Sequence, residues 1–149
     1  MAIRQIGRRR CGFTLIEMLI VITVIAILSM LVIPRAMAAR RQGKEAQIRG
    51  NLKQLRDCIE RFEATTAAWP PSLADLMASN GSAISADFDG RGGSVDRNAY
   101  DGPYMVTGNG LLPNDPFTKA CDWNYDNSTG DVHSASTLLS VNGSAINTW

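Results

Sequence analysis

The stretch GFTLIEMLIVITVIAILSMLVIP, residues 12–34, decides how the rest of the chain can fold. Its apolar part runs from Phe13 to Ile33, which is 21 residues, and only Glu17 within it carries a charge. As a helix rising about 1.5 Å per residue it would span about 31 Å, which matches a hydrocarbon core about 30 Å thick. The stretch therefore predicts a membrane-spanning helix, and the lone carboxylate inside it predicts a function for Glu17.

The residues around the start of this helix resemble a processing site. The segment before Gly12 holds four arginines, and Gly12-Phe13-Thr14-Leu15-Ile16-Glu17 is similar to the cleavage and methylation site of type IV pilins and type II secretion pseudopilins. The resemblance implies a prepilin peptidase that cuts between Gly12 and Phe13 and methylates the new amine of Phe13. It also implies that Glu17, the fifth mature residue, acts in assembly, and that Pro34 kinks the helix.

Other export signals remain as alternatives at this stage. An ordinary secretory signal could end at Ala36-Met37-Ala38, but its apolar run would be about 7–15 residues long and would not contain Glu17. A twin-arginine signal could be read into residues 9–13, although its apolar run is usually weaker. An uncleaved signal anchor explains the helix and the arginines but neither Gly12 nor Glu17. Every one of these signals leaves the arginines in the cytoplasm and exports the C-terminal part.

The charges of the chain are distributed unevenly. The formal net charge is +1, but the leader contains four arginines and no acid, so the mature chain carries −3. Residues 35–61 hold eight basic and three acidic side chains, and residues 62–149 hold three basic and ten acidic ones. This pattern predicts a basic stalk and an acidic head. We expect no nucleic-acid partner, because the basic segment is the one expected to pack inside an assembly.

The segment after Pro34 continues the helical pattern. One apolar stripe recurs at spacings of three and four residues, which is typical of a helix packed on one side: Ile48, Leu52, Leu55, Ile59 and Phe62. The stripe begins only at Ile48, so residues 35–47 should cross from the membrane to the head or contact other subunits. Trp69-Pro70-Pro71 should end the helix, because a residue before proline is driven out of the α region.

Short elements are predicted beyond the long helix. Ser72 is a good N-cap for a short amphipathic turn containing Leu73, Leu76 and Met77. Strand-like composition is present in residues 104–106 and 123–125, and residues 132–136 could return from a turn at residues 129–131 as a hairpin strand. The sequence therefore predicts an α+β fold.

The second half also resembles major pseudopilins of type II secretion in the order of its short motifs. These motifs are Trp69-Pro70-Pro71-Ser72-Leu73, Gly102-Pro103-Tyr104, Leu112-Pro113-Asn114-Asp115-Pro116-Phe117 and Asp122-Trp123-Asn124-Tyr125. The resemblance implies the pilin lollipop fold, in which a long N-terminal helix packs on a small antiparallel sheet. We divide the chain accordingly into a leader (1–12), a transmembrane and filament-core helix (13–34), an amphipathic helix (35–68) and a globular head (69–149).

No catalytic constellation is visible, and the remaining candidate sites are structural. Cys11 would leave with the leader, so Cys58 and Cys121 form an even pair that could make a disulfide in an exported protein. A calcium site is a weaker expectation, since Asp126 and Asp131 could offer oxygen ligands but do not reproduce a complete ligand set. We expect no obligatory cofactor and no enzymatic activity.

The expected function is that of a structural subunit in a type IV-like filament, most similar to a pseudopilin of a periplasmic endopilus. Two alternatives are a surface type IV pilin for adhesion or motility and a monomeric membrane-anchored binding domain. The resemblance implies several partners: further copies of the chain, sister pilins, a prepilin peptidase, and an assembly ATPase with its inner-membrane platform. The precursor would sit in the bacterial inner membrane with a cytoplasmic N-terminus and a periplasmic head, before entering a periplasmic or cell-surface filament.

Overall fold

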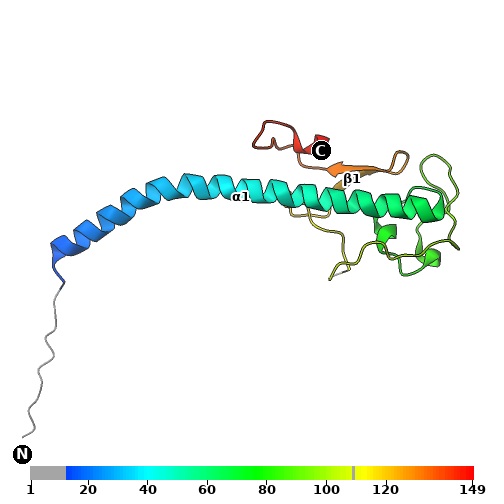
Figure 1. Cartoon of the computed structure of the whole chain (residues 1–149), viewed down its shortest axis with the longest axis horizontal. Helices are drawn as coiled ribbons and strands as arrows, with labels where there is room; N and C mark the ends of the chain where they lie inside the picture. The colour runs from blue at the N-terminus through cyan, green and yellow to red at the C-terminus, as the bar shows by residue number, and fades with distance from the viewer. Residues whose placement is uncertain (1–12, 109) are drawn as a thin grey trace, which may run out of the picture. The chain divides into compact units, whose positions relative to one another are not determined.

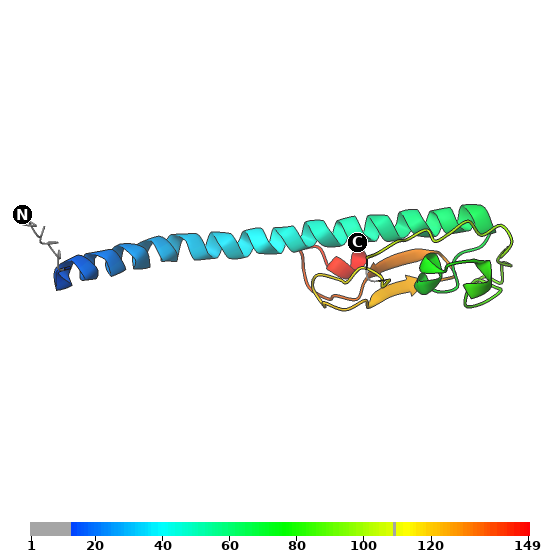
Figure 2. The same cartoon turned by 90° about the horizontal axis from the view of Figure 1, so that it is seen from below.

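The computed structural model describes residues 13–108 and 110–149, and in these ranges the chain is α+β, as predicted. Figures 1 and 2 show its elements, beginning with one long helix, α1 (Leu15–Thr66). Three short 3₁₀ helices follow in chain order with one pair of strands: η1 (Leu73–Met77), η2 (Gly81–Ala83), β1 (Trp123–Asp126), β2 (Asp131–Ser134) and η3 (Ile146–Thr148). The chain divides into two compact units, Met1–Arg40 and Arg41–Trp149.

The core of the second unit is built on the predicted stripe of α1. Its five side chains, from Ile48 to Phe62, are at most 2% exposed, which confirms the helical periodicity. They form one apolar cluster with Trp123 of β1 and Val132 of β2, among other buried residues. Figures 1 and 2 both show the hairpin lying along the C-terminal part of α1. Burial of a large aliphatic or aromatic side chain contributes about 1.5–3 kcal/mol. The packing of α1 against the hairpin is therefore the main source of stability in the unit.

The sheet that the described residues form is an antiparallel hairpin of β1 and β2. Trp123 of β1 pairs with Ser134 of β2, and Asp126 pairs with Asp131 at the turn. The return strand begins one residue earlier and ends two residues earlier than the predicted 132–136. It ends because the buried hydroxyl of Ser134 donates to the Asp115 carboxylate and accepts from the N–H of Ser136, which turns the chain away from the ladder.

The strand predicted at residues 104–106 is wrong. The N–H groups of Tyr104 and Met105 both donate to the carbonyl of Leu76, at 2.9 and 3.0 Å, so they do not pair with a strand. Met105 is buried, and the Tyr104 ring packs edge-on against Phe62 with 5.8 Å between ring centroids. The strand-like composition of this segment therefore reflects burial against α1 and not a β-ladder.

The end of α1 and the start of η1 agree closely with the sequence. The helix ends at Thr66, three residues before the Trp69-Pro70 step, and Ala67 follows with a φ of 63°. Ser72 caps η1 as predicted, since its hydroxyl accepts from the N–H of Ala74 at 3.3 Å. The Asp75 carboxylate accepts in return from the N–H of Ser72 at 2.9 Å, which completes a capping box.

The predicted disulfide between Cys58 and Cys121 is not formed, and both residues are free thiols. Cys58 is buried, and its thiol donates to the carbonyl of Tyr104 at 3.2 Å. Cys121 is exposed before β1, and its thiol donates to Leu112 and Asn114 at 3.1 and 2.9 Å. Apolar packing, and not a disulfide, holds the hairpin against α1. Each thiol donates a hydrogen bond to a different part of the head.

A substitution at the hairpin turn tests the packing between the turn and Trp69. Gly130 has a φ of 73°, and a Cβ at this position would lie 2.5 Å from Cε3 of Trp69. Gly130→Ala should therefore combine the strain of a left-handed residue with overpacking, and should lower the free energy of unfolding by about 2–4 kcal/mol. Denaturant unfolding of the variant and the wild type measures this loss.

Gly92→Ala is the matched control for this substitution. Gly92 also has a positive φ, of 82°, but no atom lies within 4 Å of an added Cβ. The control should cost only the backbone strain, about 1–2 kcal/mol. Equal losses for the two variants would show that the contact with Trp69 contributes nothing.

The two thiols should differ strongly in reactivity. Burial raises the pKa of the Cys58 thiol, although the nearby charge of Arg61 acts to lower it. In the non-reduced exported protein, a maleimide should therefore label Cys121 within minutes and Cys58 only after denaturant is added. Mass spectrometry of the labelled peptides measures both rates. Failure of both residues to label until a reductant is added would demonstrate a disulfide and contradict the structure.

Candidate assembly surface

The helix of the first unit presents apolar side chains in every direction. Within Leu15–Ile33, the large apolar side chains that the structure describes are between 43% (Met18) and 85% (Leu15) exposed. An 18-residue window of α1 has a mean hydropathy of 2.9 and is not buried in this chain. A helix that is apolar on all sides requires an apolar environment on all sides, such as a membrane or neighbouring helices. By length and composition, α1 is the one helix among the described residues that could cross a membrane.

The start of α1 is capped by Thr14. The N–H of Glu17 donates to the hydroxyl of Thr14 at 3.3 Å and to its carbonyl at 3.1 Å, and the N–H of Met18 also donates to that carbonyl. This satisfies donors that a helix start otherwise leaves free. Glu17 lies in the first turn, where the partial positive charge of the helix end favours a carboxylate. The local structure therefore accepts Glu17 at this position, but the described part of the chain gives its charge no counter-ion.

The hydroxyl groups of the apolar segment are satisfied within the helix. Thr23 donates to the carbonyl of Ile20 at 2.8 Å, and Ser29 donates to that of Ile25 at 2.8 Å. The carboxylate of Glu17, in contrast, has no hydrogen-bond or ion-pair partner within residues 13–108 and 110–149. A polar group in an apolar environment costs free energy unless it is paired. Of the polar side chains in this segment, Glu17 is the one that still needs a partner from outside.

The structure describes two of the three other residues predicted for processing or for the helix kink. Phe13 is described and 73% exposed, while Gly12 lies outside the described residues. Pro34 lies inside α1, which continues through it to Thr66. The kink at Pro34 stays a prediction.

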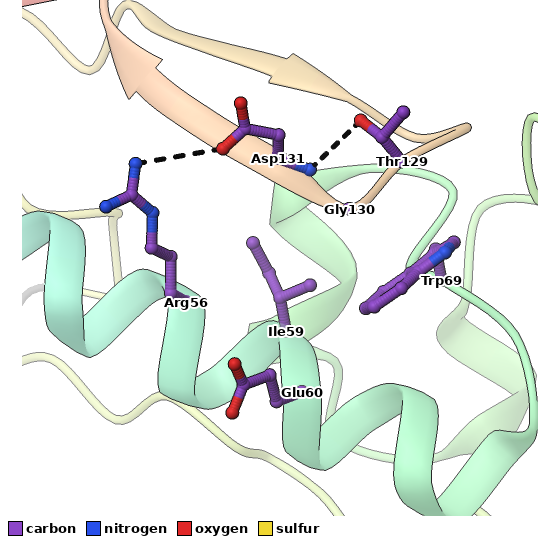
Figure 3. A pocket seen from close by; sticks show the side chains of 7 residues that line it. All are labelled: Arg56, Ile59, Glu60, Trp69, Thr129, Gly130 and Asp131. Atoms are coloured by element: carbon purple, nitrogen blue, oxygen red, sulfur yellow. Dashed lines mark hydrogen bonds and ion pairs between the residues drawn. The ribbon is translucent and has the colours of Figure 1, made fainter. Parts of the chain in front are cut away.

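The head contains small open hollows, one of which is shown in Figure 3. It has a volume of about 240 Å³ and is lined by Arg56, Ile59, Glu60, Trp69, Thr129, Gly130 and Asp131. The guanidinium of Arg56, which lines this hollow, already has partners. It lies 3.7 Å from the Asp131 carboxylate and donates to the carbonyls of Val132 and Trp149 at 2.8 and 2.6 Å. Among the described residues that line the hollow, Glu60 is therefore the charged side chain that has no partner.

Asp126 and Asp131, the weak calcium candidates, face each other as the last pair of the hairpin. Asp126 accepts from the hydroxyl and the N–H of Ser128 at 2.6 and 2.8 Å, and these hydrogen bonds lower the pKa of the Asp126 carboxyl. Asp131 is paired with Arg56. Among the described residues, no three His, Cys, Asp or Glu side chains lie together as metal ligands. The two carboxylates are accounted for by the turn and by an ion pair.

Sequence reasoning missed the polar side chains that hold the head loops to α1. Arg56 is off the apolar stripe, and nothing local predicts that it binds the C-terminal carbonyl. Glu45 is only 8% exposed, and its carboxylate accepts from the N–H of Val141 at 2.6 Å, 96 residues away. Asp115 is fully buried and also accepts from the N–H of Phe117 at 2.7 Å. Their partners are distant in sequence or are backbone groups, so no spacing signal marks them.

Comparison with known proteins finds one matching motif and similarity to two known proteins. A family model described as the prokaryotic N-terminal methylation motif matches residues 7–33. Type II secretion system core protein G of Pseudomonas aeruginosa is 31% identical over 71 residues, which are 48% of this chain and 50% of that protein. Type IV wide pilus major component PilA4 of Thermus thermophilus is 34% identical over 71 residues, 48% of this chain and 54% of that protein.

The match thus spans about half the length of these relatives, and no solved structure matches the chain. The methylation motif covers the start of the apolar helix, including Phe13 and Glu17. The chain thus carries a prokaryotic N-terminal methylation motif, and over about half of its length it is similar to a type II secretion core protein and to a type IV pilus component.

Proposed function

We propose that this protein is a structural subunit of a type IV-like filament. One observation carries the proposal: an apolar helix surface, exposed on all sides, bears a single carboxylate that has no partner among the described residues. A membrane can cover the apolar side chains but cannot neutralise Glu17 at an acceptable cost. A bundle of identical helices can do both, if each helix brings one cation to the depth of Glu17.

The cation would be the amine of Phe13 after cleavage between Gly12 and Phe13. A prepilin peptidase would make this cut and methylate the amine, as the resemblance implies. The carboxylate of Glu17 would then pair with the Phe13 amine of an adjacent subunit. Because such a pair forms at only one axial offset between two helices, it would set the register of the filament while the apolar side chains of residues 15–33 pack between subunits.

The proposed precursor is held in the bacterial inner membrane, with the leader in the cytoplasm and the head in the periplasm. This orientation follows the four arginines of the leader. Assembly would require an ATPase with an inner-membrane platform, and the filament would contain further copies of this chain and sister pilins. The chain itself needs no cofactor in this proposal.

Within the family, we favour a pseudopilin of a periplasmic endopilus over a surface pilin. The order of head motifs supports this choice, and so does the similarity to a type II secretion core protein. The similarity to a type IV wide pilus component keeps a surface pilin for adhesion or motility as the second candidate. A disulfide would have favoured the pilin, but both cysteines are free. Deletion of the gene, assayed for secreted proteins and for surface fibres in parallel, separates the two.

A monomeric membrane-anchored binding domain is the alternative from another class of protein. The hollow in Figure 3 gives it little support, because Arg56 is already bound to three partners. Sedimentation of sheared filaments from cells with and without the prepilin peptidase distinguishes a filament subunit from a monomeric domain.

Replacement of the residue before the cleavage site tests the proposed processing. Gly12→Val should leave the 12-residue leader attached, because a branched side chain would obstruct an active site shaped for glycine. Immunoblotting should show the variant at the precursor size and the wild type at the mature size. N-terminal sequencing of the wild type should begin at Phe13, and a start at Ala39 would instead establish an ordinary secretory signal.

Glu17→Leu tests the proposed role of the carboxylate. Leucine should insert into the membrane at least as well as glutamate, so leader processing should remain largely intact. In the filament, the substitution would leave a buried amine unpaired, and breaking a buried ion pair costs about 3–5 kcal/mol per subunit. The yield of sheared filaments should therefore fall to a small fraction of the wild type or to zero.

Ser29→Ala is the matched control for Glu17→Leu. It also removes a polar group from the apolar helix, but the hydroxyl of Ser29 is satisfied within its own helix. The control should be processed and assembled like the wild type. A normal filament yield from Glu17→Leu would show that the carboxylate does not set the register of the filament.

A further inference from the structure

The loop of residues 138–144 presents an exposed apolar surface on the second unit. Leu138, Leu139 and Val141 are 52%, 55% and 50% exposed, and they lie within four consecutive positions. Single exposed apolar residues are ordinary, but three on one short loop indicate a surface that contacts another apolar phase.

The loop is held rigidly in this exposed conformation. Ser140 and Ser144 join its two ends through an N–H···O bond of 2.7 Å, and their hydroxyl groups lie 2.9 Å apart. Asn142 adds a third contact, because its N–H donates to the hydroxyl of Ser140 at 3.2 Å. A preformed loop loses little conformational entropy when it binds, which favours a role for its exposed side chains.

Two side chains of α1 fasten this loop to the start of the second unit. Arg41 donates to the carbonyl of Leu139, and Glu45 accepts from the N–H of Val141 at 2.6 Å. Arg41 follows Ile33, the end of the apolar segment, by only eight residues of the continuous helix α1, or about 12 Å. The polar headgroup zone adds about 5–7 Å to each side of a hydrocarbon core. Along the chain, the residues that fasten the loop therefore follow the apolar segment closely.

The charge of the adjoining helix is the second observation. Arg35, Arg40, Arg41 and Lys44 are four basic residues with no acid until Glu45. Basic residues close to a spanning helix are normally retained on the cytoplasmic side, yet the proposed orientation exports these four. Each basic residue near an anionic lipid surface contributes to attraction. Arg41 already lies 3.8 Å from the Glu45 carboxylate, which leaves Arg35, Arg40 and Lys44 as the cations that could bind lipid phosphate groups.

We propose that the 138–144 loop is a membrane-docking surface that rests on the anionic outer leaflet of the inner membrane while the subunit awaits assembly. Leu138, Leu139 and Val141 would enter the boundary between headgroups and acyl chains, and the basic residues would bind lipid phosphates. The contact would hold the head against the membrane and would be released when the subunit enters the filament. This inference rests on the membrane-inserted precursor of the proposed function and does not require filament assembly.

The test uses the full chain in nanodiscs of phosphatidylcholine with or without phosphatidylglycerol. The three native cysteines are replaced by serine or alanine, and an environment-sensitive fluorophore is attached to Leu139→Cys. Phe88→Cys is the matched control, because Phe88 is also apolar and 59% exposed but lies in a loop bonded to Asn127 at the hairpin turn. A third label, at Leu28→Cys, reports on the spanning segment itself.

Brominated lipids should quench the fluorophore at position 139 several-fold more than at position 88, and most strongly with phosphatidylglycerol. Arg40→Gln combined with Lys44→Gln should reduce the difference between the two lipid compositions. Equal quenching at 139 and 88 overturns the proposal. Shielding of position 139 that appears only in assembled filaments also overturns it, and assigns the loop to contact with a second copy. Absence of quenching at position 28 would refute the membrane-inserted precursor, a failure distinct from that of the docking loop.

Discussion

The need to neutralise one carboxylate in an apolar helix governs how this protein can be used. Glu17 lies in the first turn of a helix whose other side chains up to Ile33 are hydrocarbon or satisfy their own polar groups. The N-cap at Thr14 and the field at the helix start support the carboxylate locally, at a level of about 0.3–1 kcal/mol. That is less than the cost of about 2.5–3.5 kcal/mol for a charge deep in a bilayer. The difference favours any assembly that supplies a cation at that depth.

The head has a different requirement, because the sheet formed by its described residues is a two-stranded hairpin. Such a hairpin is marginal by itself and requires an apolar surface to pack on. The C-terminal part of α1 supplies that surface through the stripe from Ile48 to Phe62. The long helix thus has two segments with different requirements. The apolar segment up to Ile33 needs neighbours from outside the chain, and the stripe from Ile48 to Phe62 packs against the head.

Much of the head is loop, and buried aspartates hold these loops in place. Asp89 accepts from the N–H groups of Gly93, Arg91 and Trp69 at 2.6, 2.9 and 3.3 Å. Burial acts to raise the pKa of the Asp89 carboxyl, but these hydrogen bonds and the charge of Arg91 lower it below its ordinary value. Asp75 and Asp115 bind loop N–H groups in the same manner. Buried carboxylates here replace the ladder hydrogen bonds that a larger sheet would provide.

The sequence by itself determined the long helix, its apolar and amphipathic segments, the capping of η1 by Ser72 and the hairpin at the turn before Asp131. These features depend on periodicity, length and neighbouring residues, which are all local. The candidate processing and assembly residues were also readable, because Phe13 and Glu17 stand in a short contiguous motif. Only the tertiary structure decided that residues 104–106 form no strand, that Cys58 and Cys121 are free, and that Glu45 and Arg56 hold loops about 76–96 residues away. The physical reason is that these outcomes depend on which distant groups compete for each donor and acceptor, and that competition is settled only when the loops pack on α1.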